Sequence, residues 1–186
     1  MDNMVEQRQV SLDIIKRAAE IKLVLTDNDG VLTDGGVYYS SRGEEMKKFS
    51  IRDGMGVERL RKLVDVRTGI ITGEMSGSVE KRAEKLKITE LHLGIKNKLE
   101  VFETIKSKYQ YEASQIAYIG DDTNDMEIIK AAGFTACPAD AISYVRDIVD
   151  YVCTNPGGKG AFRELAELII NAKLKKFDQN ERGENE

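Results

Sequence analysis

Residues Ile21–Gly35 read IKLVLTDNDGVLTDG and carry the strongest structural signal in the chain. Within this stretch, Lys22–Thr26 has the apolar and β-branched character of a short buried strand. The strand pattern stops at Asp27-Asn28-Asp29-Gly30, because Asp and Asn are poor strand formers and Gly permits an abrupt turn. Two carboxylates, Asp27 and Asp29, are therefore expected at the carboxyl end of a buried strand, where open α/β sheets bind their ligands.

Strand and helix patterns alternate along the rest of the chain. Further strands are predicted at Val64–Thr72, Leu91–Leu93, Gln115–Ile119, Phe134–Cys137 and Tyr151–Cys153. Helices are predicted at Val10–Glu20, Gly54–Leu63, Ser76–Leu86, Lys96–Tyr109, Met126–Ala132 and Ala161–Ala172. Asp53 is expected to cap the second of these helices. The alternation indicates a three-layer, Rossmann-like α/β fold with a parallel sheet covered by helices on both faces. We expect one domain over residues 1–172, followed by a charged, disordered tail over 173–186.

Residues 35–50 interrupt this alternation between the first strand and the first long helix. Two short β-type runs, Gly35–Tyr39 and Glu44–Phe49, flank a Ser-Ser-Arg-Gly turn, which predicts a β-hairpin. Its valine, tyrosine and phenylalanine side chains would be exposed on an isolated domain. We therefore expect another surface to cover them, as in an oligomer contact.

Composition restricts the class of partner. The chain has 186 residues, of which 41% are hydrophobic and 32% charged, and its net charge is −4. Such a mildly acidic chain argues against nucleic acid or an anionic membrane as the main partner, and no apolar run reaches the roughly 18 residues of a membrane span. The polar N-terminus lacks a signal-peptide pattern and the two cysteines form no CxxC motif, so we expect a cytoplasmic location. The single histidine, His92, excludes a multi-histidine metal site.

Polar residues follow three of the predicted strands at the points where the strands end. They are Asp27-Asn28-Asp29, Thr72-Gly73 and Asp121-Asp122. Because the carboxyl ends of parallel strands meet at one edge of a sheet, we expect these residues to form one site. Several carboxylates cannot share a small pocket as anions without a cation. Oxygen ligands such as Asp27, Asp29 and Asp121 suit Mg²⁺.

The same residues suit phosphate chemistry. Thr72 offers a hydroxyl, Gly73 a backbone N–H and Lys98 a positive charge to phosphate oxygens. A carboxylate such as Asp27 can act as the nucleophile through an aspartyl-phosphate, and a second one two residues later can protonate the leaving oxygen and then activate water. Each feature alone has an ordinary explanation as a turn, a helix cap or a surface lysine. Their occurrence in this order at four strand or helix ends favours the catalytic interpretation.

These segments resemble the four motifs of the haloacid dehalogenase-like (HAD) phosphohydrolases. The matching residues are Asp27-Asn28-Asp29-Gly30-Val31, Ile70-Ile71-Thr72-Gly73, Lys98, and Gly120-Asp121-Asp122 with Asp125. The resemblance implies Asp27 as nucleophile and Asp29 as general acid/base. It implies Mg²⁺ bound by Asp27, the Asp29 carbonyl and Asp121, and a phosphoryl group held by Thr72 and Lys98. Asp122 and Asp125 would support the metal site and the lysine.

Further motifs are similar to one branch of that family, the capless phosphatases of 2-keto-3-deoxy sugar acids. They are DGVLTDG, the hairpin, RDG at residues 52–54, NKL at 97–99, GDDTND and GGKGAFRE. Members of this branch are tetramers in which neighbouring subunits complete each active site in place of a cap domain. The resemblance therefore implies a homotetramer and a small phosphorylated sugar acid as substrate.

Four residues bear on substrate choice within that branch: Arg52, Glu74, Arg82 and Lys85. Glu74 with Lys85 resembles the nonulosonate 9-phosphate phosphatases, whereas octulosonate 8-phosphate phosphatases usually carry an arginine after the Thr-Gly pair. A glutamate can accept hydrogen bonds from sugar hydroxyls, and an arginine would seek the substrate carboxylate. Arg52 resembles the octulosonate group, and Arg82 fits both. An exposed charge pair is the alternative interpretation of Glu74 and Lys85.

The expected function is hydrolysis of a nonulosonate 9-phosphate, such as 2-keto-3-deoxynononate or N-acetylneuraminate 9-phosphate. The alternative substrate is 3-deoxy-D-manno-octulosonate 8-phosphate, of lipopolysaccharide biosynthesis. Two other classes are a non-catalytic tetramerisation module and a response-regulator-like receiver. The complete set of acidic, hydroxyl and basic residues argues against the module. The hairpin and the position of Asp29 argue against the receiver.

Overall fold

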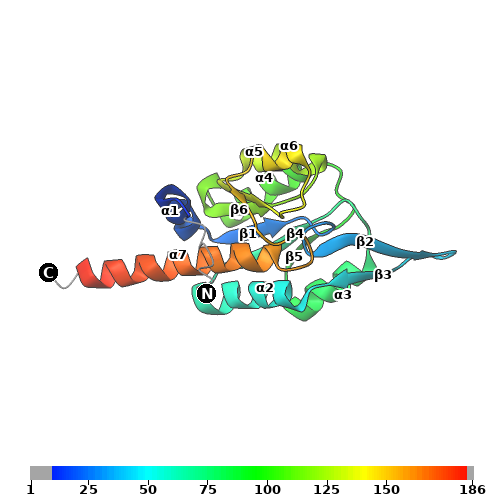
Figure 1. Ribbon diagram of the computed structural model, residues 1–186, viewed down its shortest axis with the longest axis horizontal. Coiled ribbons are helices and arrows are strands. Elements are labelled where there is room, and N and C mark those ends of the chain that lie inside the picture. The colour runs from blue at the N-terminus through cyan, green and yellow to red at the C-terminus, as the bar shows by residue number, and fades with distance from the viewer. Residues whose placement is uncertain (1–9, 184–186) are drawn as a thin grey trace, which may run out of the picture.

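Within residues 10–183, which the computed structural model describes, six parallel strands form one sheet in the order β5-β4-β1-β6-β7-β8 (Figure 1). The strands are β1 (Leu23–Thr26), β4 (Arg67–Ile71), β5 (Glu90–His92), β6 (Ile116–Ile119), β7 (Phe134–Cys137) and β8 (Tyr151–Val152). Thr26, the last residue of β1, lies opposite Ile70 of β4 and Ile119 of β6. Because every pairing is parallel, the carboxyl ends of the strands meet at one edge of the sheet.

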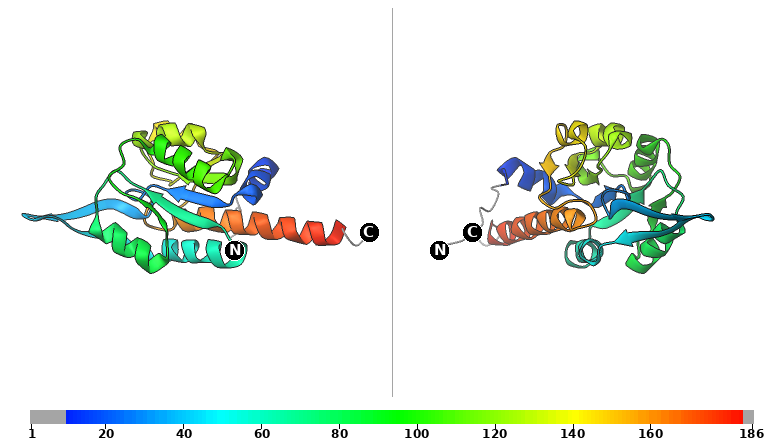
Figure 2. Two further views of the ribbon diagram at one scale, coloured as in Figure 1. Left: turned by 180° about the vertical axis from the view of Figure 1, so that it is seen from behind. Right: turned by 45° about the vertical axis from the view of Figure 1, so that its right-hand side comes forward.

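Helices cover both faces of this sheet (Figure 2). One face packs against α1 (Leu12–Glu20), α2 (Ile51–Val64), α3 (Gly77–Leu86) and α7 (Ala161–Gly183). The other packs against α4 (Lys98–Tyr109), α5 (Met126–Ala131) and α6 (Ser143–Arg146). Within β1, Val24 joins the first core cluster while Leu23 and Leu25 join the second, because successive strand residues face opposite sides. The three-layer prediction is confirmed.

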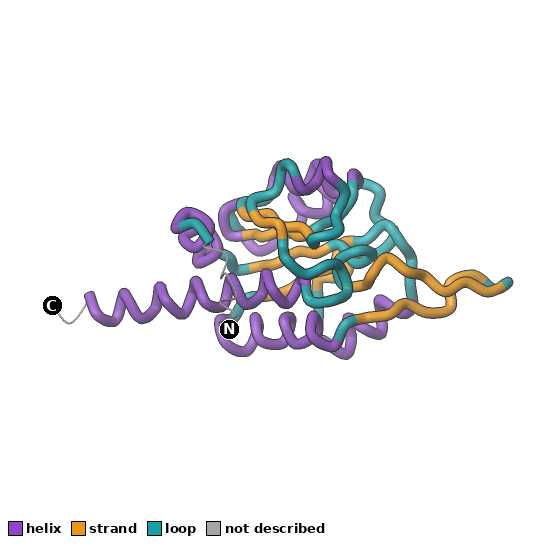
Figure 3. Tube along the Cα trace, in the orientation of Figure 1, coloured by secondary structure: helices purple, strands orange, loops and turns teal. Residues whose placement is uncertain are grey.

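Strands β2 (Thr33–Ser40) and β3 (Gly43–Phe49) form an antiparallel hairpin that extends well beyond the body of the domain (Figure 3). The predicted hairpin is therefore confirmed, with bounds close to those expected. Its outer part carries exposed apolar side chains: Tyr38 is 58% exposed, Tyr39 69% and Met46 60%. No cap domain occurs among the described residues, in which the hairpin is the insertion after β1.

The start of α2 differs from the prediction. The helix begins at Ile51, and its N-cap is Ser50, whose hydroxyl accepts the Asp53 N–H over 3.3 Å. Asp53 is buried, and its carboxylate accepts the N–H groups of Gly160 (3.2 Å) and Arg163 (2.9 Å) at the start of α7. The prediction that Asp53 caps α2 is wrong, because this carboxylate satisfies the N-terminal N–H groups of another helix.

The end of α7 also differs. The helix continues to Gly183, whereas the charged composition predicts an end at Ala172 and disorder beyond it. Lys173 Nζ donates to the Ala19 carbonyl over 3.0 Å, and Lys176 pairs with Glu20 over 2.5 Å, so α1 supplies partners for the charged side chains. Residues 173–183 thus continue α7, where the composition predicts a disordered tail. Residues 1–9 and 184–186 lie outside the described residues, as do the side chains beyond residue 176.

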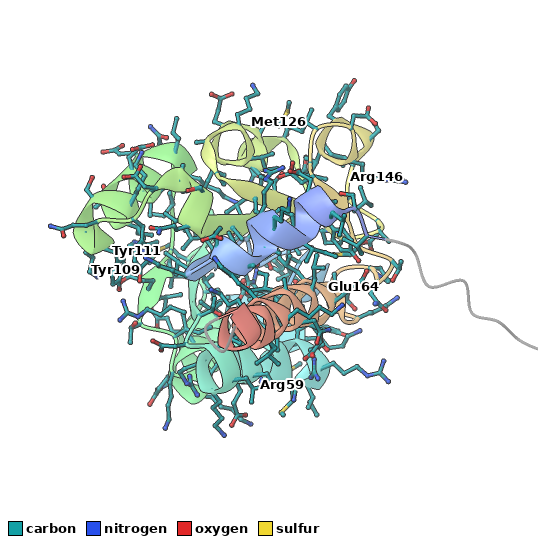
Figure 4. The ribbon with its side chains drawn as sticks, turned by 90° about the vertical axis from the view of Figure 1, so that its left-hand side faces the viewer. Arg59, Tyr109, Tyr111, Met126, Arg146 and Glu164 are labelled. Atoms are coloured by element: carbon teal, nitrogen blue, oxygen red, sulfur yellow. The ribbon has the colours of Figure 1, made fainter. Side chains whose placement is uncertain are left out.

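Helix α7 packs between two other helices of its layer, α1 and α2. Figure 4 shows α7 between α1 and α2, and Arg59 of α2 pairs with Glu167 of α7 over 2.7 Å. Glu164 of α7 accepts hydrogen bonds from the N–H groups of Thr154 and Asn155, which anchors the loop before the glycine-rich segment. None of the described helices is both long enough and apolar enough to cross a membrane.

Candidate active site

The turn after β1 fixes Asp27 at the edge of the sheet. The Asp27 N–H donates to the Ile119 carbonyl of β6 over 3.0 Å, so the backbone is still held in the sheet at this residue. The Asn28 carbonyl closes the turn by accepting the N–H groups of residues 31–33. The Asp27 side chain is buried, and its Oδ1 accepts the Asn28 N–H over 2.7 Å. A buried carboxylate is thus held at the carboxyl end of an internal strand.

The end of β6 brings further carboxylates to the same point. One carboxylate oxygen from each of Asp27, Asp121 and Asp125 lies within 4.8 Å of the other two. Gly30 permits this approach, because it has φ +86° and a Cβ there would lie 2.0 Å from Asp121 Oδ2. Asp125 Oδ2 accepts the N–H groups of Asp121 (2.9 Å) and Asp122 (3.3 Å), which fixes the second acidic turn. Three carboxylates are therefore gathered at one edge of the sheet.

Lys98 bridges two of these carboxylates. It is the first residue of α4, whose N-cap is Asn97. Its Nζ lies 3.0 Å from Asp27 Oδ2 and 2.6 Å from Asp125 Oδ1. The Tyr118 hydroxyl also donates to Asp125 Oδ1, over 2.5 Å. Burial opposes the charged form of Lys98, but attraction by the two carboxylates outweighs burial and raises the pKa of the ammonium.

One ammonium does not neutralise three carboxylates. Burial, followed by repulsion from Asp125, raises the pKa of Asp27. Burial, followed by repulsion from Asp27 and Asp125, raises the pKa of Asp121 to about 8. Asp121 Oδ1 is also buried without a hydrogen-bond partner in the described part of the chain. A hard cation among these oxygens would relieve the repulsion and satisfy the free acceptor, so the residues fit Mg²⁺.

The two residues that the resemblance assigns to support differ in their surroundings. Asp125 is fully buried and is occupied by Lys98, Tyr118 and two backbone N–H groups. Asp122 is exposed, and its Oδ1 accepts the Thr123 N–H over 2.6 Å as the cap of the short helix η2 (Thr123–Asp125). Asp27 and Asp121 are thus the carboxylates of the cluster with capacity left for a cation.

The Asp29 carboxylate lies outside this cluster and faces the hairpin. Its Oδ1 accepts hydrogen bonds from Lys47 Nζ (2.6 Å), Asn28 Nδ2 (3.0 Å) and Thr33 Oγ1 (3.4 Å). Its Oδ2 is buried and has no partner among the described residues. The sequence predicted Asp29 but not Lys47. The run Gly43–Phe49 gives no local sign of a buried lysine, because a strand normally turns a residue such as Met46 inward instead.

Thr72 and Gly73 follow β4, the neighbour of β1. The Thr72 N–H donates to the His92 carbonyl over 3.0 Å, and its hydroxyl oxygen accepts the Glu74 N–H over 3.3 Å. Thr72 is buried, whereas Gly73 is exposed. The pairing of β4 with β1 brings this turn beside the Asp27 turn, as the predicted sheet requires.

The four residues predicted to select the substrate have different surroundings. Arg82 donates to the Ser50 carbonyl over 2.7 Å, so an intramolecular contact already accounts for its position. Glu74 and Lys85 are both exposed, and no ion pair joins them in the part of the chain that the structure describes. Arg52 is exposed in the first turn of α2. These residues remain candidates for contact with a substrate, with Arg82 the most constrained.

Comparisons with known proteins agree with this geometry. A family model described as haloacid dehalogenase-like hydrolase matches residues 69–165. The 3-deoxy-D-manno-octulosonate 8-phosphate phosphatase KdsC of Escherichia coli (strain K12) is similar to this chain, with 39% identity over 166 residues that cover 89% of this chain and 88% of that protein.

Solved structures give the same result. The crystal structure of 3-deoxy-D-manno-octulosonate 8-phosphate phosphatase from Yersinia pestis has a TM-score of 0.85 and 39% identity, covering 89% of each chain. The phosphatase of the same name from Moraxella catarrhalis, in complex with magnesium ion, phosphate ion and KDO molecule, has a TM-score of 0.84 and 37% identity, covering 92% of this chain and 97% of that chain. The chain therefore belongs to the haloacid dehalogenase-like hydrolases, in the branch of the capless sugar-acid phosphatases.

Proposed function

We propose that this protein is a Mg²⁺-dependent phosphatase that hydrolyses the terminal phosphate ester of a 2-keto-3-deoxy sugar acid. The observation that carries the proposal is the buried Asp27 carboxylate, 3.0 Å from Lys98 Nζ and clustered with Asp121. A carboxylate with an adjacent ammonium and spare capacity for a cation is suited to attack phosphorus and to accept a phosphoryl group.

We further propose 3-deoxy-D-manno-octulosonate 8-phosphate as the preferred substrate. The relatives from Escherichia coli and Yersinia pestis carry that name at 39% identity, and the Moraxella catarrhalis structure holds a KDO molecule. This support favours the eight-carbon ester over the nine-carbon ester that Glu74 and Lys85 suggested. Similarity over 89% of the chain outweighs two exposed positions.

In the proposed reaction, Asp27 attacks phosphorus, the bond between phosphorus and the sugar oxygen breaks, and Asp29 gives its proton to that oxygen. Asp29, now ionised, takes a proton from a water molecule as the water attacks the phosphorus of the aspartyl-phosphate. Inorganic phosphate leaves and the Asp27 carboxylate is regenerated. The Thr72 hydroxyl, the Gly73 N–H and the Lys98 ammonium would hold the phosphoryl oxygens through both steps.

Asp27, Asp121 and the Asp29 carbonyl would hold the Mg²⁺ ion. When bound, the ion would supply positive charge to the phosphoryl oxygens and reduce repulsion between them and the attacking carboxylate. Asp125 would keep Lys98 in place and fix the turn that carries Asp121, and Asp122 would cap the short helix that follows.

Replacement of the nucleophile tests this function. We expect Asp27→Asn to lower kcat by about 10⁴-fold or more, because the amide cannot form the phosphorylated intermediate. The Asp34→Asn variant, which changes an acidic residue on the hairpin, is the matched control. Full activity in Asp27→Asn, or turnover that is unchanged by chelation of Mg²⁺, would contradict the proposal and favour a non-catalytic module.

The substrate is tested by kcat/KM on octulosonate 8-phosphate and on nonulosonate 9-phosphates. We expect the eight-carbon ester to be preferred. The opposite order would restore the nine-carbon assignment and would give Glu74 and Lys85 the specificity role. Both candidate substrates are small molecules.

The cytoplasmic location, expected from the polar N-terminus and the two cysteines, stays a prediction.

We also propose a homotetramer in which neighbouring subunits complete each active site. The exposed Tyr38, Tyr39 and Met46 on the projecting hairpin support a surface that a partner subunit covers. Light scattering coupled to size exclusion measures the mass. A fully active monomer would contradict this assembly.

A further inference from the structure

Lys47 is a buried ammonium to which the proposed reaction assigns no role. It lies in β3 of the hairpin, between the exposed residues Met46 and Lys48. The Lys47 side chain itself has no exposed area. Removal of an ammonium from water has a high free-energy cost unless the charge is paired. The surroundings of this group therefore indicate what it does.

Two carboxylates pair with Lys47. Its Nζ lies 2.6 Å from Asp29 Oδ1 and 3.5 Å from Glu44 Oε2. Burial opposes the charge, but these carboxylates outweigh it and raise the pKa of Lys47. Glu44 also accepts the hydroxyl of Ser76, the N-cap of α3. A chain of polar contacts thus connects the first turn of α3, through the hairpin, to the Asp29 carboxylate.

The contacts of Asp29 are all on one oxygen. Lys47, Asn28 and Thr33 each donate to Oδ1, and Lys47 makes the shortest of the three bonds. Asn28 and Thr33 belong to the same turn as Asp29, whereas Lys47 comes from 18 residues further along the chain. Oδ2 is left buried without a partner among the described residues. The carboxyl group is therefore fixed in rotation, with one defined oxygen available to carry the proton.

We propose that Lys47 is a positioning residue that holds the Asp29 carboxyl group so that Oδ2 performs the proton transfers. This inference rests on the proposed acid/base role of Asp29. It makes the placement of the hairpin a requirement for proton transfer to the sugar oxygen. A lysine that only attached the hairpin to the domain would instead affect every reaction of the enzyme alike.

Two phosphate esters separate these roles. The sugar-acid ester, like any alkyl ester, has a poor leaving group that needs a proton, whereas p-nitrophenolate leaves without one. In the first turnover, Lys47→Met should lower the rate with the sugar-acid ester by about 10²-fold, the low end of general-acid contributions. The first-turnover burst of p-nitrophenol should keep the wild-type rate, and only the later steady state should slow, because hydrolysis of the aspartyl-phosphate needs Asp29 as a base.

Three further variants serve as controls for this experiment. Lys48→Met, the same change at the neighbouring exposed lysine, should leave both rates unchanged. Lys47→Arg keeps the charge and should recover part of the sugar-ester rate, and it serves as the test if Lys47→Met does not fold. Addition of Lys47→Met to Asp29→Asn should cause no further loss, because the residue that Lys47 positions is already disabled.

Equal losses with both esters, or no loss with either, would overturn the role of Lys47. Asp29→Asn separates this failure from a failure of the proposed function. If Asp29→Asn itself shows no selective loss with the sugar-acid ester, the acid/base role of Asp29 is wrong. If Asp29→Asn shows the selective loss and the Lys47 variants do not, only the positioning role is wrong.

Discussion

Two regions of the molecule each supply one buried lysine to the turn after β1. Lys98 at the start of α4 is shared by Asp27 and Asp125, whose side chains are 7% and 0% exposed. Lys47 on the hairpin is shared by Asp29 and Glu44, which are 23% and 14% exposed. The first region holds an excess of buried negative charge. The second holds an oriented hydrogen bond from Lys47 to Asp29, whose side chain is partly exposed to solvent.

The two aspartates of this turn are therefore prepared for their roles in different ways. Asp27 belongs to an electrostatic cluster that a cation would complete, which suits a nucleophile for phosphorus. Asp29 is oriented through one oxygen by three donors, which suits a group that must deliver a proton along one direction. The stability of the protein should therefore depend more on Lys98 than on Lys47.

The largest effect is expected from Lys98→Met. The substitution leaves buried carboxylates without their ammonium, so we expect a loss of about 3–5 kcal/mol in the free energy of unfolding at neutral pH without metal. Urea unfolding measures it. Lys96→Met, at an exposed lysine two residues earlier, is the matched control. An unfolding free energy equal to that of the wild type would show that the cluster does not depend on Lys98.

The place of Lys98 in the active site could be predicted from the sequence, but the contact of Lys47 with Asp29 could not. Strand ends, the glycines after them and the start of a helix near Lys98 are local patterns, and parallel pairing brings the strand ends together whatever the rest of the chain does. The partner of a hairpin lysine depends instead on how the hairpin packs on the domain. No local pattern contains that information.

The corrected elements have the same cause. Asp53 contacts Gly160 across 107 residues, and Lys176 contacts Glu20 across 156. From local sequence, Asp53 was predicted to cap its own helix and Lys176 to lie in a disordered tail. Tertiary packing decides both. It also places Arg82, because Gly54 leaves room for its guanidinium to reach Ser50, since a Cβ at Gly54 would lie 2.4 Å from Arg82 Nη2. The substrate role of Arg82 stays a prediction.

A pH dependence is the next largest effect and belongs to the Lys98 region. The pKa of Asp121 is raised from 3.8 to about 8. Its contribution to stability is therefore full below pH 3.8 and is lost as pH rises through about 8. We expect the metal-free protein to lose on the order of 2 kcal/mol across this window, after allowance for the partial exposure of the side chain.

The measurement is urea unfolding between pH 4 and pH 8.5, with and without Mg²⁺. Because a cation binds the ionised carboxylates, the stabilisation by Mg²⁺ should grow with pH. Asp121→Asn should remove the part of the slope that Asp121 contributes and leave the part due to Asp27, whose pKa burial and Asp125 also raise. A slope of the opposite sign in the metal-free protein would mean that the cluster is neutralised by groups other than a cation.

A smaller stability effect is expected from Lys47→Met, about 1–2 kcal/mol, because Asp29 keeps its bonds from Asn28 and Thr33. A double-mutant cycle with Asp29→Asn measures the coupling of the pair. The contrast between the regions would be lost if Lys47→Met destabilised the protein as much as Lys98→Met. Lys47 would then be mainly an attachment of the hairpin.

The smallest effect is expected from Lys48→Met. Lys48 lies in the same strand as Lys47 and has the same charge, but its side chain is exposed and pairs with Asp34 at the surface. A surface ion pair of this kind contributes little to stability. We therefore expect no change in the melting temperature or in the rate with either phosphate ester. If Lys48→Met reproduced the slower sugar-ester turnover of Lys47→Met, the net charge of the hairpin, and not the bond to Asp29 Oδ1, would control proton transfer. An unchanged Lys48→Met beside an impaired Lys47→Met would assign the effect to one buried ammonium and the single oxygen that it holds.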